Sequence, residues 1–215
     1  MKKIGKALLQ VSLGMSMART IPAVILAAGA SNRLGEPKSM IDFAGLPLVR
    51  WAFDHLAAAG CEPIFIVTRA ELSVDVLLAV PNAKVSINPN PELGRTGSLQ
   101  NGISSLFSDL GSLPRKLVIA PVDRPGWNAK MVKELLLQKH TVCPSYKGRK
   151  GHPVVINSAD MEQILSAPSD MPLRDIVSFV EVSVEAPWLH LNIDTPEDIR
   201  NLDEHKAELF AYFRQ

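Results

Sequence analysis

The sequence predicts a single-domain α/β fold in which a doubly wound, mostly parallel sheet is flanked by helices. Three observations support this prediction. Short apolar runs without polar alternation recur along the chain, as in strands that are covered on both faces. Segments with apolar residues at helical spacing separate these runs, which is the pattern of β-α units. No repeat, low-complexity linker or change of composition divides residues 20–215, so we assign residues 21–215 to one domain.

The first half of the chain alternates predicted strands with predicted helices. The strands cover residues 23–27, 63–68, 84–87 and 116–120, which are short and rich in branched apolar side chains. The first helix is predicted from Leu46, Val49, Phe53 and Leu56, which recur at helical spacing before Gly60 as a C-cap. Residues 72–80, 98–107 and 128–139 show a similar helical pattern.

The second half of the chain is more mixed. After Thr141 the turn-rich segment YKGRKGHP leads into residues 153–156, which we interpret as a strand from a hairpin or a sheet-edge excursion. The clearest helix start lies near the C-terminus, where Thr195 stands as N-cap, Pro196 at the first helical position and Asp198 three residues after the cap. This helix is expected to run towards Phe213.

Composition and charge exclude several classes of protein. With 215 residues, 47% hydrophobic and 21% charged, the chain is neither disordered nor collagen-like nor a coiled coil. The 23 Lys and Arg residues against 22 Asp and Glu residues leave a formal charge of +1. Such a chain has no overall positive electrostatic field that would attract nucleic acid or anionic lipid. Any site that binds phosphate must therefore depend on a local group of residues.

The N-terminal residues and the cysteines bear on the compartment. We interpret residues 1–20 as an N-terminal extension, either disordered or a mis-assigned start, because Met15 and Met17 precede the first strand; a secretory signal peptide is the alternative. No apolar run reaches the roughly 18 residues that a membrane helix needs. Cys61 and Cys143 lack a CxxC or His-rich context, which indicates reduced thiols. We therefore expect a soluble, cytoplasmic protein.

The most informative stretch is residues 26–38, LAAGASNRLGEPK, directly after a predicted buried strand. Gly29 and Gly35 allow the backbone to bring N–H groups against phosphate oxygens, and Arg33 and Lys38 supply fixed cations. Neither the GxxxxGK[ST] loop nor the dinucleotide fingerprint GxGxxG is present. The simpler alternative is a β-α turn whose two cations are solvated.

This stretch resembles the LAAGxSxRxGxxK signature of nucleotidyltransferases related to the molybdenum cofactor cytidylyl- and guanylyltransferases. The resemblance implies a Rossmann-like nucleotidyltransferase fold. It also implies catalytic roles for two residues, with Lys38 stabilising the α-phosphate and Arg33 holding the β- and γ-phosphates. The nucleotide-binding residues that it implies here are Leu26, Ala27, Ala28, Gly29, Ser31, Arg33, Gly35 and Lys38.

A second segment, NPNPELGRTGSLQNGI at residues 88–103, resembles the family segment that contacts the base and ribose. The resemblance implies nucleotide-binding roles for Asn88, Gly97 and Ser98. From the residues alone, Gly94 and Gly97 permit close backbone approach, and capping of the following helix explains Ser98 equally well.

Two aspartates are candidate metal ligands. Asp123 follows a predicted buried strand in the segment PVDRP, at the kind of position where an α/β sheet binds its ligands. The segment resembles the family's D-x-P motif, but Arg124 departs from the usual sequence GDMP. The segment NIDTPEDI resembles the family's DIDTPEDL, which implies that Asp194 is the second ligand. One Mg²⁺ between these carboxylates would order the triphosphate. The alternatives are a solvated turn for Asp123 and helix initiation alone for the TPED part.

The turn GRKGHP at residues 148–153 looks like the RGHP element of the cytidylyltransferase side of the family. The resemblance implies that His152 binds the acceptor. A structural histidine in a turn is the alternative, and Arg149 and Lys150 are equally well explained as solvated charges.

These resemblances predict a Mg²⁺-dependent transfer of a nucleoside monophosphate, CMP from CTP in the leading version, to a phosphorylated acceptor, molybdopterin, with release of pyrophosphate. The implied partners are these small molecules and a transient molybdoenzyme contact, without nucleic acid or membrane. GTP is the alternative to CTP as the nucleotide substrate. A sugar-phosphate or alcohol-phosphate nucleotidyltransferase is the first alternative. A non-catalytic nucleotide- or cofactor-binding protein that serves a molybdoenzyme is the second.

Overall fold

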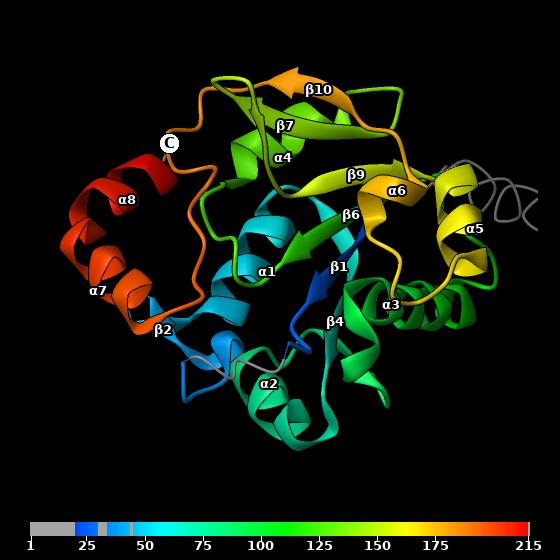
Figure 1. Cartoon of the computed structure of the whole chain (residues 1–215), viewed down its shortest axis with the longest axis horizontal. Helices are drawn as coiled ribbons and strands as arrows, with labels where there is room; N and C mark the ends of the chain where they lie inside the picture. Colours follow the sequence, from blue (N-terminus) through cyan, green and yellow to red (C-terminus); the bar gives the residue numbers. More distant parts are fainter. Residues whose placement is uncertain (1–19, 30–33, 44, 215) are drawn as a thin grey trace, which may run out of the picture.

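A computed structural model describes residues 20–29, 34–43 and 45–214 of the chain. A mixed sheet forms its centre, with strand order β10-β7-β9-β6-β1-β4-β5 and β8 paired to β7 (Figure 1). The strands of this sheet are β1 (Ile21–Leu26), β4 (Cys61–Thr68), β5 (Lys84–Ile87), β6 (Lys116–Pro121), β7 (Val142–Tyr146), β8 (Arg149–Lys150), β9 (Val154–Asn157) and β10 (Val180–Ser183). A separate ribbon pairs β2 (Asp42–Phe43) with β3 (Leu46–Pro47). The interpretation of residues 1–20 lies outside the described residues, apart from Thr20.

Helices cover both faces of the sheet. They are α1 (Leu48–Ala58), α2 (Ser73–Ala79), α3 (Gly94–Leu110), α4 (Ala129–Leu136), α5 (Ser158–Ser166), α6 (Leu173–Ile176), α7 (Pro196–Glu204) and α8 (Lys206–Phe213), with 3₁₀ turns η1 (Lys38–Met40), η2 (Ala70–Leu72) and η3 (Pro91–Leu93). Ala23 and Ile25 of β1 belong to the core under α1 and α4, whereas Val24 belongs to the core under α3 and α5. All three are fully buried, which explains why this strand reads as a continuous apolar run.

The sheet is mostly parallel, as predicted. Strand β1 lies between β4 and β6 and is parallel to both, β5 is parallel to β4, and β10 is parallel to β7. The predicted hairpin is present, since β7 and β8 are antiparallel. Strand β9 does not lie at an edge, however, because it pairs antiparallel with both β6 and β7. The turn-rich segment therefore returns the chain into the middle of the sheet.

The ends of two helices follow from their sequence. Gly60 lies just beyond α1 with φ of 89°, a conformation that glycine adopts without strain. At the start of α7, the Thr195 side chain accepts from the Asp198 backbone and the Asp198 carboxylate accepts from the Thr195 backbone, which is the predicted capping box. The single helix expected up to Phe213 is wrong, because His205 leaves the helical conformation and divides the segment into α7 and α8.

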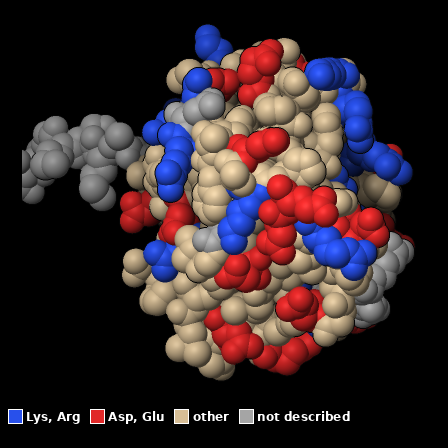
Figure 2. Space-filling model, turned by 90° about the vertical axis from the view of Figure 1, so that its left-hand side faces the viewer, with Lys and Arg blue, Asp and Glu red and all other residues tan. Residues whose placement is uncertain are grey.

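The surface and the cysteines agree with the composition. The face that carries α7 and α8 shows both acidic and basic side chains (Figure 2), in keeping with the small net charge. Cys61 and Cys143 are both buried and free. Among the residues that the structure describes, no helix is long and apolar enough to cross a membrane.

Candidate functional site

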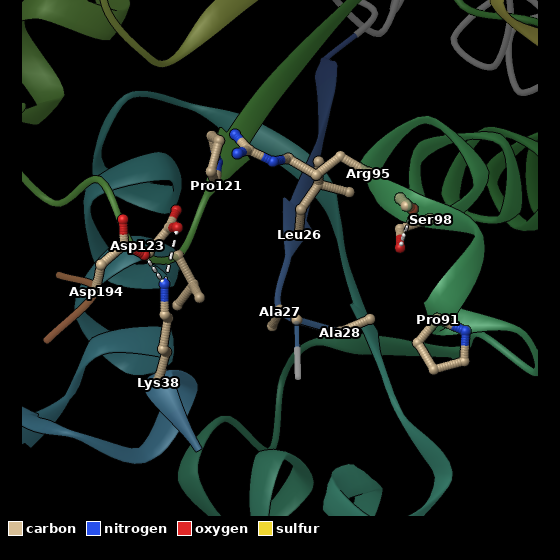
Figure 3. Close-up of a pocket in the computed structure, with 13 residues that line it drawn as sticks. Leu26, Ala27, Ala28, Lys38, Pro91, Arg95, Ser98, Pro121, Asp123 and Asp194 are labelled. Atoms are coloured by element: carbon tan, nitrogen blue, oxygen red, sulfur yellow. Dashed lines mark hydrogen bonds and ion pairs between the residues drawn. The ribbon is translucent and has the colours of Figure 1, made fainter. Parts of the chain in front are cut away.

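A pocket of about 250 Å³ opens at the carboxyl ends of β1 and β6, the place where parallel sheets present ligands (Figure 3). Strand β1 continues into its floor, and the segment after β6 and the first turn of α3 form two of its walls. The residues that line it are Leu26, Ala27, Ala28, Gly29, Lys38, Pro91, Gly94, Arg95, Ser98, Pro121, Val122, Asp123 and Asp194.

One side of the pocket holds a lysine between two carboxylates. The ammonium Nζ of Lys38 lies 3.4 Å from Oδ2 of Asp123 and also donates a short hydrogen bond to Oδ1 of Asp194. The three side chains are partly buried, so water screens their interactions less than it would on an open surface. Hydrogen bonds from Lys38 and then from Asn192 hold the pKa of the Asp194 carboxyl below its ordinary value. Asp194 therefore faces this centre as a carboxylate at neutral pH.

Backbone contacts hold the two aspartate segments side by side. The N–H of Ile193 donates to the carbonyl of Asp123 at 3.0 Å, and the N–H of Val122 donates to the carbonyl of Leu26 at 3.1 Å. Gly126 lies so close to the 188–189 backbone that a Cβ there would stand 1.6 Å from the carbonyl oxygen of Trp188. Only glycine permits this approach, which brings the end of β6 against the segment before α7.

We expect Gly126→Ala to destabilise the fold by about 3 kcal/mol, because the new methyl group forces two backbone segments apart. Urea unfolding of the variant measures this loss. Gly111→Ala is the matched control, since a Cβ there meets nothing within 4 Å and only the φ of 73° disfavours alanine. It is expected to cost about 1 kcal/mol. Equal losses in the two variants would contradict the close packing at Gly126.

The capping box of α7 also positions Asp194. The carboxylate of Asp198 accepts hydrogen bonds from the backbone N–H groups of Asp194 and Thr195, at 2.9 and 2.8 Å. The side chain of Asn192 donates to Asp194 Oδ2. Helix initiation therefore explains the TPED residues and at the same time fixes the backbone from which Asp194 reaches the pocket.

The opposite wall comes from α3. The amide Nδ2 of Asn88 donates to the hydroxyl of Ser98 at 3.0 Å, and this hydroxyl donates to the carbonyl of Gly94 at 3.2 Å. The alternative interpretation of Ser98 as the cap of the following helix is wrong, because α3 begins at Gly94 and Ser98 lies in its first turns. Arg95 was not among the predicted site residues, although it lies within residues 88–103, the segment predicted to contact the nucleotide. Its side chain crosses the pocket towards Pro121 (Figure 3).

The structure brings some of the predicted residues together and leaves others apart. Asn88 lies behind Ser98 and is buried, outside the pocket lining. Gly97 packs on the neighbouring loop, where its N–H donates to the carbonyl of Ser169 at 2.9 Å. Gly35 has φ of 76° and also lies outside the lining. Ser31 and Arg33 fall outside the described residues. The predicted residues that line the pocket are Leu26, Ala27, Ala28, Gly29, Lys38, Ser98, Asp123 and Asp194.

His152 lies beyond the carboxylates and outside the pocket lining. It follows Gly151, where a Cβ would stand 2.4 Å from the side chain of Leu189, so close packing explains this glycine. Burial, then the charge of Arg124 and that of Arg95, lower the pKa of His152 to about 4, while Asp123 acts in the opposite direction. The imidazole is therefore neutral at pH 7.

A comparison with protein families decides the affiliation. A family model described as the MobA-like NTP transferase domain matches residues 23–186, which is most of the chain. The chain belongs to this family. The matched residues of the MobA-like domain include most of β1, all of η1 and the strand that precedes Asp123, but they end before Asp194.

Two curated proteins are similar in sequence to this MobA-like protein. It is 25% identical to a molybdenum cofactor guanylyltransferase of Xanthomonas euvesicatoria, over 62% of this chain and 62% of the relative. It is 28% identical to a 2-C-methyl-D-erythritol 4-phosphate cytidylyltransferase of Nocardia farcinica, over 70% of this chain and 65% of the relative. The chain thus spans less than two thirds of the length of each.

Solved structures share the fold of the MobA-like protein. The Rv0371c protein of Mycobacterium tuberculosis superposes with a TM-score of 0.71 at 21% identity, over 86% of this chain and 97% of that one. A manganese complex of Rv0371c superposes with a TM-score of 0.68 at 18% identity, over 86% and 98%. The extensive coverage of both chains shows that the sheet and its flanking helices are common to these proteins.

Asp123 and Asp194 of the MobA-like protein are a donor set that fits the ligand preference of a magnesium ion. Asp123 and Asp194 each present an oxygen to the same ammonium, so a cation near that position meets two carboxylates. Within the described ranges, no group of three or more His, Cys, Asp or Glu side chains is arranged to hold a metal. Mg²⁺ is usually bound by one or two carboxylates, with substrate phosphates and water completing its shell. The pair therefore fits such an ion.

Proposed function

We propose that this MobA-like protein is a Mg²⁺-dependent nucleotidyltransferase that transfers a nucleoside monophosphate from an NTP to a phosphorylated acceptor. The observation that carries the proposal is the placement of Lys38 between Asp123 and Asp194 at the mouth of the pocket. A fixed cation and carboxylates that bind a metal can together stabilise the charge that develops during transfer at a triphosphate. The small residues 27–29 form the adjoining floor, where the chain can approach a phosphate closely.

The chemistry needs no nucleophile from the protein. An oxygen of the acceptor phosphate attacks the α-phosphorus, a new P–O bond forms, and the bond to the β-phosphate oxygen breaks as pyrophosphate leaves. The acceptor phosphate is already ionised at neutral pH, so no side chain has to remove a proton. Lys38 stabilises the charge that develops on the α-phosphate, and the pocket walls align the two substrates.

Asp123 and Asp194 would hold the metal ion. When bound, Mg²⁺ supplies positive charge to the triphosphate and to the pyrophosphate that leaves. The manganese complex of Rv0371c, which shares this fold, supports a divalent cation in the proposal.

We propose CTP and molybdopterin as the first substrate pair. The turn at residues 148–153, which resembles the cytidylyltransferase element RGHP, supports the choice of cytosine. GTP is the second candidate because one relative is a molybdenum cofactor guanylyltransferase. The relative that acts as a 2-C-methyl-D-erythritol 4-phosphate cytidylyltransferase supports a phosphorylated alcohol as the alternative acceptor.

Pyrophosphate release tests the proposal. The assay contains Mg²⁺ and CTP, GTP, ATP or UTP in turn, with molybdopterin and then with a panel of sugar and alcohol phosphates. Release that requires both CTP and molybdopterin is the expected result. Release with another pair would keep the mechanism and change the substrate. Binding of an NTP without release in any combination would contradict the enzyme and favour a nucleotide-binding protein.

A further inference from the structure

The ammonium of Lys38 lies between the two carboxylates that would hold the metal ion. It donates to Oδ2 of Asp123 at 3.4 Å and to Oδ1 of Asp194 through a short hydrogen bond (Figure 3). The proposed function gives the same ammonium a different partner, the α-phosphate of the nucleotide. Lys38 thus has two partners to choose between, and in this structure it contacts the carboxylates.

The two carboxylates are fixed in place by contacts of their own. The carbonyl of Asp123 accepts from the N–H of Ile193 at 3.0 Å, which joins the two aspartate segments. The N–H of Asp194 donates to the carboxylate of Asp198 at 2.9 Å, and its Oδ2 accepts from the side chain of Asn192. None of these contacts involves the lysine, so they hold the two aspartates in place when the ammonium leaves.

Lys38 is the member of this cluster that can move. It lies at the start of the 3₁₀ turn η1 and reaches the carboxylates through a flexible four-carbon stem. Its side chain is 16% exposed and lines the pocket, so the ammonium borders the space that a nucleotide would enter. Rotation about the bonds of this stem carries the ammonium from the carboxylates into the pocket without movement of the backbone.

The ammonium and a metal ion compete for the same oxygens. Mg²⁺ binds carboxylate oxygens at about 2.0–2.1 Å. An ion that close to both carboxylates would meet the positive charge of Lys38 at short range, because the ammonium itself stands 3.4 Å from Oδ2 of Asp123. The centre is partly buried, so water screens this repulsion only in part. Lys38 therefore has to leave the carboxylates before they bind a metal ion.

We propose that Lys38 occupies the metal position in the protein without nucleotide, and that it exchanges the two carboxylates for the α-phosphate when nucleotide and metal bind. The inference rests on the proposed function, because that function supplies the triphosphate to which the ammonium moves. Before the exchange, Lys38 offsets the repulsion between Asp123 and Asp194. Metal alone therefore binds weakly, and nucleotide and metal increase each other's affinity, because both are bound once the ammonium has moved.

Binding of Mn²⁺ in the absence of nucleotide tests this exchange without turnover. The ion is titrated calorimetrically into the unsubstituted full-length protein and into Lys38→Met, whose side chain has a similar length but neither charge nor donor. The variant is expected to bind Mn²⁺ at least about tenfold more tightly, because the ion no longer has to replace a charge-assisted hydrogen bond. A lysine that serves the phosphate alone predicts equal affinities.

The same titration with a saturating non-hydrolysable CTP analogue tests the second half of the exchange. The difference between the two proteins is expected to fall below about threefold, because the nucleotide then holds the ammonium of Lys38 away from the carboxylates. Persistence of the tenfold difference would overturn the α-phosphate as the second partner of Lys38.

Matched variants locate the effect. Lys38→Met combined with Asp194→Asn is expected to lose the gain, because one of the two carboxylates is gone. Arg124→Gln is the control for general electrostatics, because Arg124 acts on the Asp194 carboxyl as a charge through space and, among the described residues, forms no ion pair with it. It is expected to change the Mn²⁺ affinity less than about threefold. Lys84→Met, which breaks the exposed pair with Asp109, is expected to leave this affinity unchanged.

Thermal unfolding supplies a second readout and shows whether the variant folds. Without metal, Lys38→Met is expected to have a lower Tm than the unsubstituted protein, because the two carboxylates lose their counter-charge. Mn²⁺ is expected to raise the Tm of the variant more, since a tighter ligand stabilises the folded state more strongly. Lys38→Gln, which is also uncharged but remains polar, repeats both measurements if Lys38→Met does not fold.

Equal or weaker Mn²⁺ binding by Lys38→Met in the absence of nucleotide would overturn the exchange. A gain of the same size in Arg124→Gln, or a gain that survives the additional Asp194→Asn change, would overturn it as well. The proposed transfer is judged separately, because the titrations contain no acceptor. If Lys38→Met gains Mn²⁺ affinity while no substrate pair releases pyrophosphate, the transfer fails and the displacement of Lys38 from the carboxylates stands.

Discussion

Replacing Lys38 with alanine is expected to lower kcat/KM for pyrophosphate release by about 10²- to 10³-fold, the usual cost of losing one charge-stabilising group at a reacting centre. The Lys38 ammonium faces two carboxylates at the pocket mouth, where an α-phosphate would carry developing charge. Steady-state kinetics with saturating Mg²⁺ and the best substrate pair measures the loss. The circular dichroism spectrum should stay unchanged, because the side chain contributes little to the apolar core.

Lys84→Ala is the matched control for Lys38. Lys84 also pairs with a carboxylate, that of Asp109, but it lies on β5 at the edge of the sheet and outside the pocket. Its removal is expected to leave kcat/KM unchanged. Kinetics of Lys38→Ala equal to those of the unsubstituted protein would remove the proposed role of Lys38.

Substituting asparagine for Asp194 is expected to weaken Mg²⁺-dependent binding of a non-hydrolysable NTP analogue by at least about tenfold, and Asp123→Asn by a similar amount. Each change removes one negative charge from a pair that would face the metal. Titration of the analogue with and without Mg²⁺ separates the effects. The metal-independent part of the binding should fall little, because the triphosphate itself gains no carboxylate contact.

The control for the aspartates is Asp109→Asn, which removes an exposed carboxylate from the Lys84 pair. It should leave binding unchanged at every Mg²⁺ concentration. If Asp194→Asn loses analogue affinity equally with and without Mg²⁺, the carboxylate serves the local hydrogen bonds of the 192–198 segment rather than a metal.

Local signals in the sequence predicted much of the fold. The branched apolar run at residues 23–27 predicted β1, and Thr195 with Asp198 predicted the start of α7, because strand burial and helix capping depend on a few neighbouring residues. Ser98 shows the limit of such signals. A serine near a helix start is compatible with capping, and only the position of Gly94 as the first helical residue shows that Ser98 lies inside α3.

The sequence by itself determined the alternation of strands and helices, the family motif at residues 26–38 and the carboxylates worth testing. Tertiary structure decided what lies together. Lys38 is 85 residues from Asp123 and 156 from Asp194. Lys38 and Asp123 meet because β1 and β6 are parallel neighbours whose carboxyl ends share one edge, and Asp194 joins them because the N–H of Ile193 donates to the carbonyl of Asp123. Periodicity reports which face of an element is buried, whereas proximity between distant segments depends on strand order and close backbone contacts such as Gly126 against Trp188.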